Sequence, residues 1–468
     1  MPGALSAQSA ARDLERLATP PEWLRRIADP DVVASALYPH LGVVGCELVR
    51  VRIKAESNTA VYRISLLDGA GASTVVELRG EVVPAGRRQP PKGMHGAVGD
   101  ATWRCSLPDL HLVLSPGAAD AALPALPALM DPPLACGVLE RAIHEAGDPR
   151  YADLSINACT LDVRRHKPGS RCTALYRLDL PPGSPRHWPR RVVAKTYWGG
   201  KGQVAWDAMT ALWRSSLGSS PIVAIAEPVG FLAEERVLVQ RALPHTGTYK
   251  DLLRRVLSGE GRDPLAELGP AAERIGRGLA ELHGSGVVSS VKHTWADEAA
   301  EVRDVATRLA RLVPDLDGVG TEVLARLEAR SATVPAQAPM PAHGSFRPAQ
   351  VLLDGDGGVG FIDFDSFCMA EPAFDVALFC TSLRDTGLRA CLRRGERATE
   401  HLAMLDELCE AFVAGYRSAA SLSQTRLEVW SALHVITGVQ HCWTKVKFDR
   451  LPYRLNLLEH ELARGAHA

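Results

Sequence analysis

The sequence lacks the features that mark several common classes of protein. Its 53 basic and 54 acidic side chains give a formal net charge of -1, so it has no excess of positive charge to attract DNA, RNA or an anionic membrane surface. The ten cysteines form no CxxC pair and have no metal-ligand spacing, which is typical of reduced thiols in a cytoplasmic protein. These absences favour a globular cytoplasmic protein that binds neither nucleic acid nor membrane.

Long apolar runs are also absent. The N-terminal stretch MPGALSAQSAARDLERL has no uninterrupted apolar core, so we expect no signal peptide. The most apolar region, AADAALPALPALMDPPLACG, is broken by prolines and is not expected to span a bilayer. The glycine-rich GGKGQ segment does not fit the GxxxxGK(S/T) frame of a P-loop.

Two segments of the chain share a pattern that predicts a small antiparallel sheet. ELVRVRIKAESNTAVYRISLLDGAGASTVVELRGEVV is followed much later by LDVRRHKPGSRCTALYRLDLPPGSPRHWPRRVVAKTY, and each contains a Tyr-Arg-aliphatic strand and a strand that begins Val-Val. We interpret this as an internal repeat over residues 45–85 and the later sheet; chance similarity between amphipathic hairpins is the alternative. When the Val-Val strands are aligned, Lys195 matches Leu78, so only the second copy is expected to carry a charge there.

The rest of the chain is predicted to be mostly helical. The stretch VLLDGDGGVGFIDFD predicts a β-hairpin within this region. A small sheet followed by helices that enclose one hairpin predicts a two-lobed α+β fold. We place an N-terminal α+β module at 1–135, the sheet lobe at 136–243 and the helical lobe at 244–468. Helical patterns occupy windows near 202–217, 264–285, 296–312, 373–394, 400–418 and 424–445.

The segment AHGSFRPAQVLL carries the chemistry. His343-Gly-Ser-Phe-Arg-Pro-Ala-Gln350 fits the H-x-D-x-x-x-x-N frame of a kinase-type catalytic loop, except that Ser345 replaces the aspartate. Asp363 in FIDFD then falls where a metal-binding aspartate belongs. Phosphoryl transfer needs such metal ligands, a group that orients the acceptor hydroxyl, and a lysine on the phosphates. Lys195 in VVAKTY is the candidate lysine, although a solvated strand lysine has the same local sequence.

Taken together, HGSFRPAQ, the FIDFD strand, EPAFDVA and the upstream GRGLAELHGSG resemble the aminoglycoside phosphotransferase/choline kinase family. In that family HGDxHPxN, an IDW- or IDF-type strand and a DPAxDLA segment recur in this order. The resemblance covers about residues 160–445 and leaves the first 150 residues outside. It implies a protein kinase-like fold, with ATP and Mg²⁺ as cofactors.

The resemblance also implies roles for the matching residues. Lys195 would hold the α- and β-phosphates of ATP, with Asp207 as its ion-pair partner where the family usually has glutamate. Arg347 would approach the γ-phosphate. Asp363 and Gln350 would bind magnesium, the glutamine amide oxygen taking the place of asparagine.

Two further sets of residues follow from the same comparison. LVQRALPHTG resembles the hinge between lobes, where backbone groups of Gln240 and Ala242 would meet adenine. His343 and Asp375 are expected to brace the catalytic loop through hydrogen bonds rather than to react.

Ser345 is the departure from the family pattern. A serine hydroxyl is no general base at neutral pH, but it can orient an acceptor by hydrogen bonding. Loss of a general base costs on the order of 10²–10⁴ in rate. Asp365 would project on the same strand face as Asp363, so it is a candidate second metal ligand or replacement base; a capping or turn carboxylate is the alternative.

These residues support several functions. The first is an ATP-dependent phosphotransferase that acts on a hydroxyl of a small molecule or natural product, or on Ser or Thr of a biosynthetic peptide. The extra N-terminal module favours a peptide or protein partner. A catalytically degenerate pseudokinase that serves as a nucleotide-binding scaffold is the alternative, and nucleotidyl transfer through an inverted nucleotide has no residue in its favour.

Overall fold

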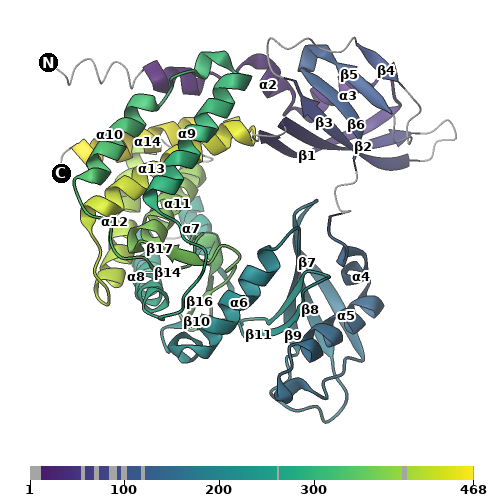
Figure 1. Ribbon diagram of the computed structural model, residues 1–468, viewed down its shortest axis with the longest axis vertical. Helices are drawn as coiled ribbons and strands as arrows, with labels where there is room; N and C mark the ends of the chain where they lie inside the picture. Colours follow the sequence, from purple (N-terminus) through teal and green to yellow (C-terminus); the bar gives the residue numbers. More distant parts are fainter. Residues whose placement is uncertain are drawn as a thin grey trace. The chain divides into compact units, whose positions relative to one another are not determined.

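The computed structural model describes residues 12–53, 58–67, 73–83, 92–95, 103–117, 122–260, 263–392 and 398–466. The chain divides into two compact units, coloured along the sequence in Figure 1. Unit 1 comprises residues 1–119, 295–335 and 432–468, and unit 2 comprises 120–294 and 336–431. The sequence-based boundaries at residues 135 and 243 cut the chain differently, because unit 1 also contains segments from the C-terminal half.

Unit 1 contains an antiparallel sheet with the strand order β1-β2-β3-β6-β5-β4. Helices α2 (Glu22–Arg26) and α3 (Pro30–Leu37) precede the sheet. The sheet predicted within residues 45–85 is confirmed for the described part of that stretch. The strands are β1 (Val43–Ile53), β2 (Asn58–Leu67), β3 (Ser73–Val82), β4 (Gly93–His95), β5 (Arg104–Leu107) and β6 (Leu112–Pro116). Later helices of the unit are α9 (Trp295–Leu312), α10 (Thr321–Ala332) and α14 (Leu451–Ala466).

Unit 2 contains a second antiparallel sheet, with the order β11-β12-β9-β8-β7. Helices α4 (Leu126–Met130) and α5 (Pro132–Glu145) precede this sheet, and α6 (Lys201–Arg214) follows β9 (Figure 1). Because side chains alternate along a strand, Val192 and Ala194 of β9 face the apolar core shared with α5, while Lys195 faces the other way. The strands are β7 (Ala158–Lys167), β8 (Arg171–Asp179), β9 (Arg191–Tyr197), β11 (Pro228–Leu232) and β12 (Val237–Arg241).

The two sheets repeat one arrangement in detail. Tyr62 of β2 and Tyr176 of β8 lie in the matching sequences TAVYR and TALYR, and both side chains are fully buried. The Tyr62 hydroxyl donates to the Ile27 carbonyl at 2.7 Å, and the Tyr176 hydroxyl donates to the Leu129 carbonyl at 2.6 Å. Each acceptor stands two residues before an Asp-Pro pair at the start of a helix. The repeat is therefore confirmed, and it includes the helix before each sheet.

Strand register corrects the equivalence of Leu78 and Lys195. Thr59 pairs with Glu81 in the first sheet, and the matching Thr173 pairs with Lys195 in the second. The counterpart of Lys195 is thus Glu81, and the expectation that only the second copy carries a charge is wrong. Aligning the Val-Val dipeptides gave a shift of three residues, because register depends on the pairing between strands and not on the start of one strand.

The helical part of unit 2 surrounds the predicted hairpin. Strands β15 (Val351–Leu353) and β16 (Val359–Phe361) form that hairpin, and β10 (Val223–Ile225) and β13 (Gly247–Thr248) flank it. The predicted helical windows and the α+β class are confirmed. The remaining elements are α7 (Tyr249–Arg255), α8 (Pro264–His283), β14 (Met340–Ala342), β17 (Cys368–Ala370), α11 (Pro372–Leu392), α12 (Ala398–Arg417) and α13 (Gln424–Thr444), which runs from unit 2 into unit 1. Within the described ranges, no helix has the length and apolar character needed to cross a membrane.

Candidate active site

The catalytic-type loop after β14 is held by Asp375 of α11. The buried Asp375 carboxylate accepts hydrogen bonds from the His343 amide at 2.6 Å and the Gly344 amide at 3.1 Å. Burial alone would raise the pKa of Asp375, but hydrogen bonding and charge from His283 outweigh it and lower the pKa below its usual value. The predicted bracing of the loop by His343 and Asp375 is confirmed.

The loop and the FIDFD segment pack backbone to backbone. Gly344 has a φ of 79°, and a Cβ there would lie 1.7 Å from the Ser366 carbonyl oxygen, so only glycine fits. The His343 Nε2 lies 3.0 Å from the Ile362 carbonyl oxygen. Asp363 itself has a φ of 76°, a conformation that non-glycine residues rarely adopt outside functional sites and tight turns. Loop and strand thus form one continuous support.

Lys195 lies at the centre of an ion cluster on this support. Its Nζ donates to Asp363 Oδ1 at 2.8 Å and to Asp365 Oδ1 at 3.1 Å. Tyr197 donates its hydroxyl to Asp365 Oδ1 at 2.9 Å. Arg171 completes the cluster, with Nη1 2.5 Å from Asp365 Oδ2 and 3.2 Å from Asp363 Oδ1. Two cations therefore balance two carboxylates.

Mutual charge fixes the protonation of this cluster. Burial would lower the pKa of Lys195, but Asp365 and Asp363 outweigh it and raise the pKa. Burial would raise the pKa of Asp363, yet the charges of Lys195 and Arg171 hold it well below the ordinary range. Burial and the Asp365 charge raise the pKa of Tyr197 well above its ordinary value. Asp363 is therefore an ionised carboxylate beside a charged lysine and a neutral phenol.

Arg171 and Tyr197 are the members of the cluster that the sequence analysis missed. Arg171 is the first residue of β8, directly after the Lys-Pro-Gly-Ser turn, and it pairs with Tyr197 of β9. Since paired residues share a sheet face, Arg171 projects on the same side as Tyr197 and Lys195. Strand alternation around that turn was the available signal.

Ser345 lies among polar partners on the loop. Its Oγ accepts a hydrogen bond from Gln350 Nε2 at 3.2 Å and lies 3.5 Å from His343 Nδ1. Burial lowers the pKa of His343, so the ring is neutral; with Nε2–H donating to Ile362, Nδ1 is the nitrogen that can accept from Ser345. The Gln350 Oε1 is buried and has no hydrogen-bond partner among the described residues.

The predicted ion pair between Lys195 and Asp207 is wrong. Asp207 is exposed on α6 and accepts a hydrogen bond from Gln203 at 2.8 Å. The buried face of α6 is formed by Gly202, Ala205, Ala208, Met209 and Leu212. The helical period of 3.6 residues places Asp207 away from that face, and Asp365 acts as the counter-ion of Lys195 instead.

The remaining predicted residues lie at the predicted hinge and on the catalytic-type loop. Gln240 is buried in β12, and the Ala242 amide already donates to the Arg191 carbonyl at 3.0 Å. Of the two backbone groups of Ala242, only the carbonyl is therefore available for the predicted contact with adenine. Arg347 is exposed on the loop.

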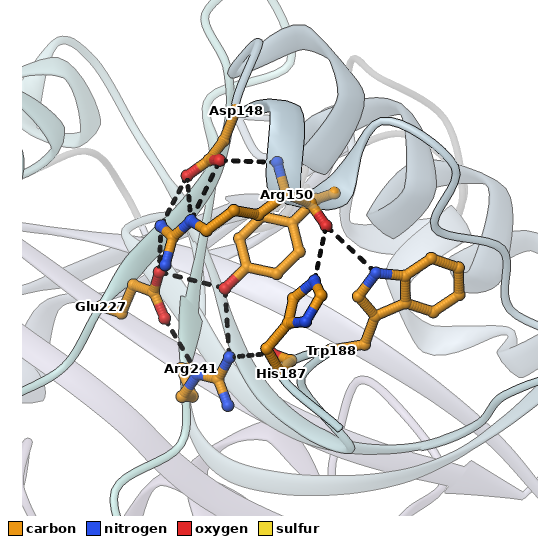
Figure 2. A network of polar contacts seen from close by, with 7 residues as sticks. Asp148, Arg150, His187, Trp188, Glu227 and Arg241 are labelled. Atoms are coloured by element: carbon orange, nitrogen blue, oxygen red, sulfur yellow. Dashed lines mark hydrogen bonds and ion pairs between the residues drawn. The ribbon is translucent and has the colours of Figure 1, made fainter. Parts of the chain in front are cut away.

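A second polar network braces the predicted hinge (Figure 2). The buried Glu227 carboxylate accepts from Arg241 Nε at 3.0 Å and from Arg150 Nη2 at 2.6 Å. The His187 and Trp188 rings both lie against the Arg150 carbonyl oxygen, at 3.0 and 3.1 Å. Because a buried carboxylate is stable only when it is paired, this network fixes the backbone at Arg241, between Gln240 and Ala242.

Comparisons with known proteins agree with the resemblance seen in the sequence. Residues 208–412 match the model of the phosphotransferase enzyme family. No curated protein matches the chain. A glucosamine kinase structure is similar over 95% of this chain and 99% of its own, with 16% identity and a TM-score of 0.47. A spectinomycin phosphotransferase in complex with ADP and spectinomycin is similar over 71% of this chain and 98% of its own, with 11% identity and a TM-score of 0.44.

The family match contains the catalytic-type loop, Asp363, Asp365 and Asp375. It ends within α12 and begins after Lys195, so Lys195 and Arg171 lie upstream of the matched residues. The predicted family resemblance is confirmed for residues 208–412, which match the model of the phosphotransferase enzyme family, and the predicted α+β fold class is confirmed as well.

Proposed function

We propose that this protein transfers the γ-phosphoryl group of ATP, with Mg²⁺, to a hydroxyl group. The observation that carries the proposal is the contact of 2.8 Å between Lys195 Nζ and Asp363 Oδ1, which joins the candidate phosphate and metal ligands at one point. Phosphoryl transfer depends on positioning and charge stabilisation rather than on covalent chemistry by the protein. Lys195 would hold the α- and β-phosphates, and Arg347 would approach the γ-phosphate from the loop.

The residues present fit a magnesium ion. Asp363 is ionised, and Gln350 offers a buried amide oxygen that lacks a hydrogen bond within the described chain. No group of three or more His, Cys, Asp or Glu side chains suited to a metal lies within the described ranges. Magnesium retains waters and binds through one or two carboxylates together with substrate phosphates. Asp363 and Gln350 would hold it, and bound there it would neutralise charge on the phosphates.

Ser345 would orient the acceptor. Its hydroxyl oxygen has two lone pairs, of which Gln350 Nε2 uses one. With its own hydrogen directed at His343 Nδ1, the second lone pair is left to accept from the acceptor hydroxyl. Such a contact aligns the attacking oxygen without removing its proton, which is consistent with altered but working chemistry.

Asp365 has the environment of a counter-ion rather than of a free base or metal ligand. Lys195 and Tyr197 donate to one of its oxygens, and Arg171 donates to the other. In the loaded enzyme, Asp365 would hold both cations beside the phosphates. Its role as a second metal ligand or replacement base, expected from the sequence, has less support than this one.

The acceptor would be a small molecule or natural product, or Ser or Thr of a biosynthetic peptide. The sheet of unit 1 exposes Val44, Leu67 and Val75 on β1, β2 and β3, and apolar side chains beside an edge strand suit the capture of an extended peptide. Transfer of phosphate from ATP to small alcohols and to Ser/Thr peptides, each followed by mass spectrometry, separates the two acceptor classes.

A pseudokinase is the second candidate function. Ser345 in place of aspartate and the displacement of Asp207 from Lys195 favour it. This function predicts binding of nucleotide without transfer to any acceptor.

Calorimetric titration with ATP tests the nucleotide site. We expect Mg²⁺-dependent binding in the wild type and its loss in Lys195→Ala and Asp363→Ala. Asp207→Ala is the matched control, because it removes an exposed carboxylate that makes no contact with the cluster. Unchanged binding in both cluster variants would falsify the kinase-like interpretation of the site.

Substitution of Ser345 tests the transfer step. Ser345→Ala should lose less turnover than Asp363→Ala, and Ser345→Asp should raise turnover by supplying the missing base. If neither the wild type nor Ser345→Asp turns over ATP with any acceptor, while both bind it, the scaffold function is favoured.

A further inference from the structure

The side chain of Arg171 bridges the two carboxylates of the ion cluster. Its Nη1 contacts both Asp365 and Asp363, and its Nη2 lies 3.4 Å from Asp363 Oδ2. The guanidinium reaches these atoms from the start of β8, 192 residues before Asp363 in the chain. We propose that Arg171 is a phosphate-binding residue that contacts the γ-phosphate of bound ATP. This inference rests on the proposed phosphotransferase function.

The contact lengths indicate which ion pair of Arg171 breaks when the phosphate binds. The pair with Asp365 is short, at 2.5 Å, whereas the two contacts with Asp363 are 3.2 and 3.4 Å. Asp363 is also the residue that would bind magnesium, and a carboxylate that binds a cation competes poorly for a guanidinium. On loading, Arg171 would keep Asp365 and release Asp363. Nη2 would then be free to donate to a phosphate oxygen.

Strand geometry keeps the guanidinium beside the reacting phosphate. Arg171 pairs with Tyr197, and Tyr197 also donates to Asp365. Asp365 is thereby held from one side by Tyr197 and Lys195 and from the other by Arg171. An anchored arginine loses less conformational freedom on binding a phosphate than a mobile one, and its planar fork matches phosphate oxygens. Asp365 is accordingly a positioning residue for both cations.

Burial separates this role from that of a purely structural pair. The Arg171 side chain remains 21% exposed, while those of Lys195 and Asp365 are each 7% exposed. The Arg171 side chain is therefore partly open to solvent, as a residue that binds a ligand must be. By comparison, the Arg426–Glu371 pair in the same unit is buried on both sides, at 3% and 5%, and has no such access.

Titration calorimetry with magnesium, using ADP and a non-hydrolysable ATP analogue, tests the assignment. We expect Arg171→Gln to weaken binding of the ATP analogue by about tenfold to a hundredfold, as for the loss of a charge-assisted hydrogen bond, and binding of ADP much less. The affinity of Arg171→Lys for the ATP analogue should lie between those of Arg171→Gln and the wild type, because lysine keeps the charge without the fork. The matched control is Arg177→Gln, an exposed position on the same strand, which should bind both nucleotides as the wild type does.

Other results would overturn the assignment. If Arg171→Gln weakens binding of ADP and of the ATP analogue equally, or tightens binding of either one, Arg171 serves only as a counter-ion of Asp365 and Asp363. Thermal unfolding of each variant shows whether a loss of binding comes from a loss of fold, and the Arg171→Lys variant keeps the test decisive if Arg171→Gln is unstable. A wild type that binds neither nucleotide would overturn the proposed function itself, which distinguishes that failure from a failure of Arg171 alone.

Discussion

The two sheets of this protein share an architecture but differ in chemistry. In each, a buried tyrosine in a Thr-Ala-aliphatic-Tyr-Arg strand donates to a carbonyl two residues before an Asp-Pro helix start. At the position that pairs with the strand threonine, the first sheet has Glu81 and the second has Lys195. The sheet framework is thus present twice, and the lysine that we propose binds phosphate is present once.

The comparison separates what folds a sheet from what makes it reactive. The tyrosine bonds and the apolar faces are common to both copies, so they serve the fold. By the same register, Arg171 of the second copy corresponds in sequence to Ser57 of the first, which lies outside the described residues. At the position of Lys195 the first sheet therefore has a carboxylate, which would repel a phosphate rather than bind it.

The largest expected effect comes from removing the charge at the matched position. Lys195→Ala should lower phosphoryl transfer by about 10²–10³-fold, because it removes a preorganised donor to the phosphates. Glu81→Ala, the matched change in the first sheet, should leave transfer within about twofold of the wild type. Steady-state turnover with the acceptor found by mass spectrometry measures the effects of both substitutions. Equal losses from the two substitutions would break the comparison, since the first sheet would then share in the chemistry.

The support of the catalytic-type loop by Asp375 should be sensitive to acid. Asp375→Asn should lower the free energy of unfolding by about 3 kcal/mol at neutral pH, because it disrupts a buried charged network. The folded pKa of Asp375 is depressed, so its stabilisation is complete above the unfolded value of about 4 and is lost as the pH falls through the folded value. Chemical denaturation from pH 7 to pH 3 should therefore show the gap between wild type and variant narrowing in acid. A gap that widened in acid would contradict this charge state.

The shared tyrosines offer a smaller, paired test. Tyr62→Phe and Tyr176→Phe should each lower the free energy of unfolding by about 1–3 kcal/mol, because each leaves a buried carbonyl without its donor. Denaturant titration of the two variants compares the copies directly. Similar losses would support equivalent structural roles, whereas a loss in only one copy would show that the repeat is geometric and not energetic.

The smallest effect is expected on the outer face of the first sheet. Val75→Ser should change the free energy of unfolding by no more than about 0.5 kcal/mol, since the side chain is exposed. If this sheet captures the acceptor, the variant should still raise the KM for a peptide acceptor while leaving ATP binding unchanged. An unaltered KM for every acceptor would show that Val75 takes no part in capture.

The sequence predicted features that depend on local pattern and missed those that depend on distant pairing. Helical periodicity and the Asp-Gly-Asp-Gly-Gly turn are local, so the helices and the β15–β16 hairpin followed from them. Asp207 was assigned to the wrong face of α6, because the face that a helical residue occupies depends on its exact position within the turn. Arg171 was missed because the two carboxylates that it contacts lie 192 and 194 residues further along the chain, and only the tertiary fold brings them together.

The support of the catalytic-type loop bears on how this protein evolves. Asp375, Gly344 and the His343 ring hold the loop through its backbone, and none of these contacts depends on the side chain at position 345. A substitution at that position would change the proposed catalytic side chain and leave the fold in place. Selection could then adjust reactivity there without first repairing stability. In the proposed function, Ser345 would thus stand at a site where a single codon separates one catalytic strategy from another in an otherwise unchanged protein.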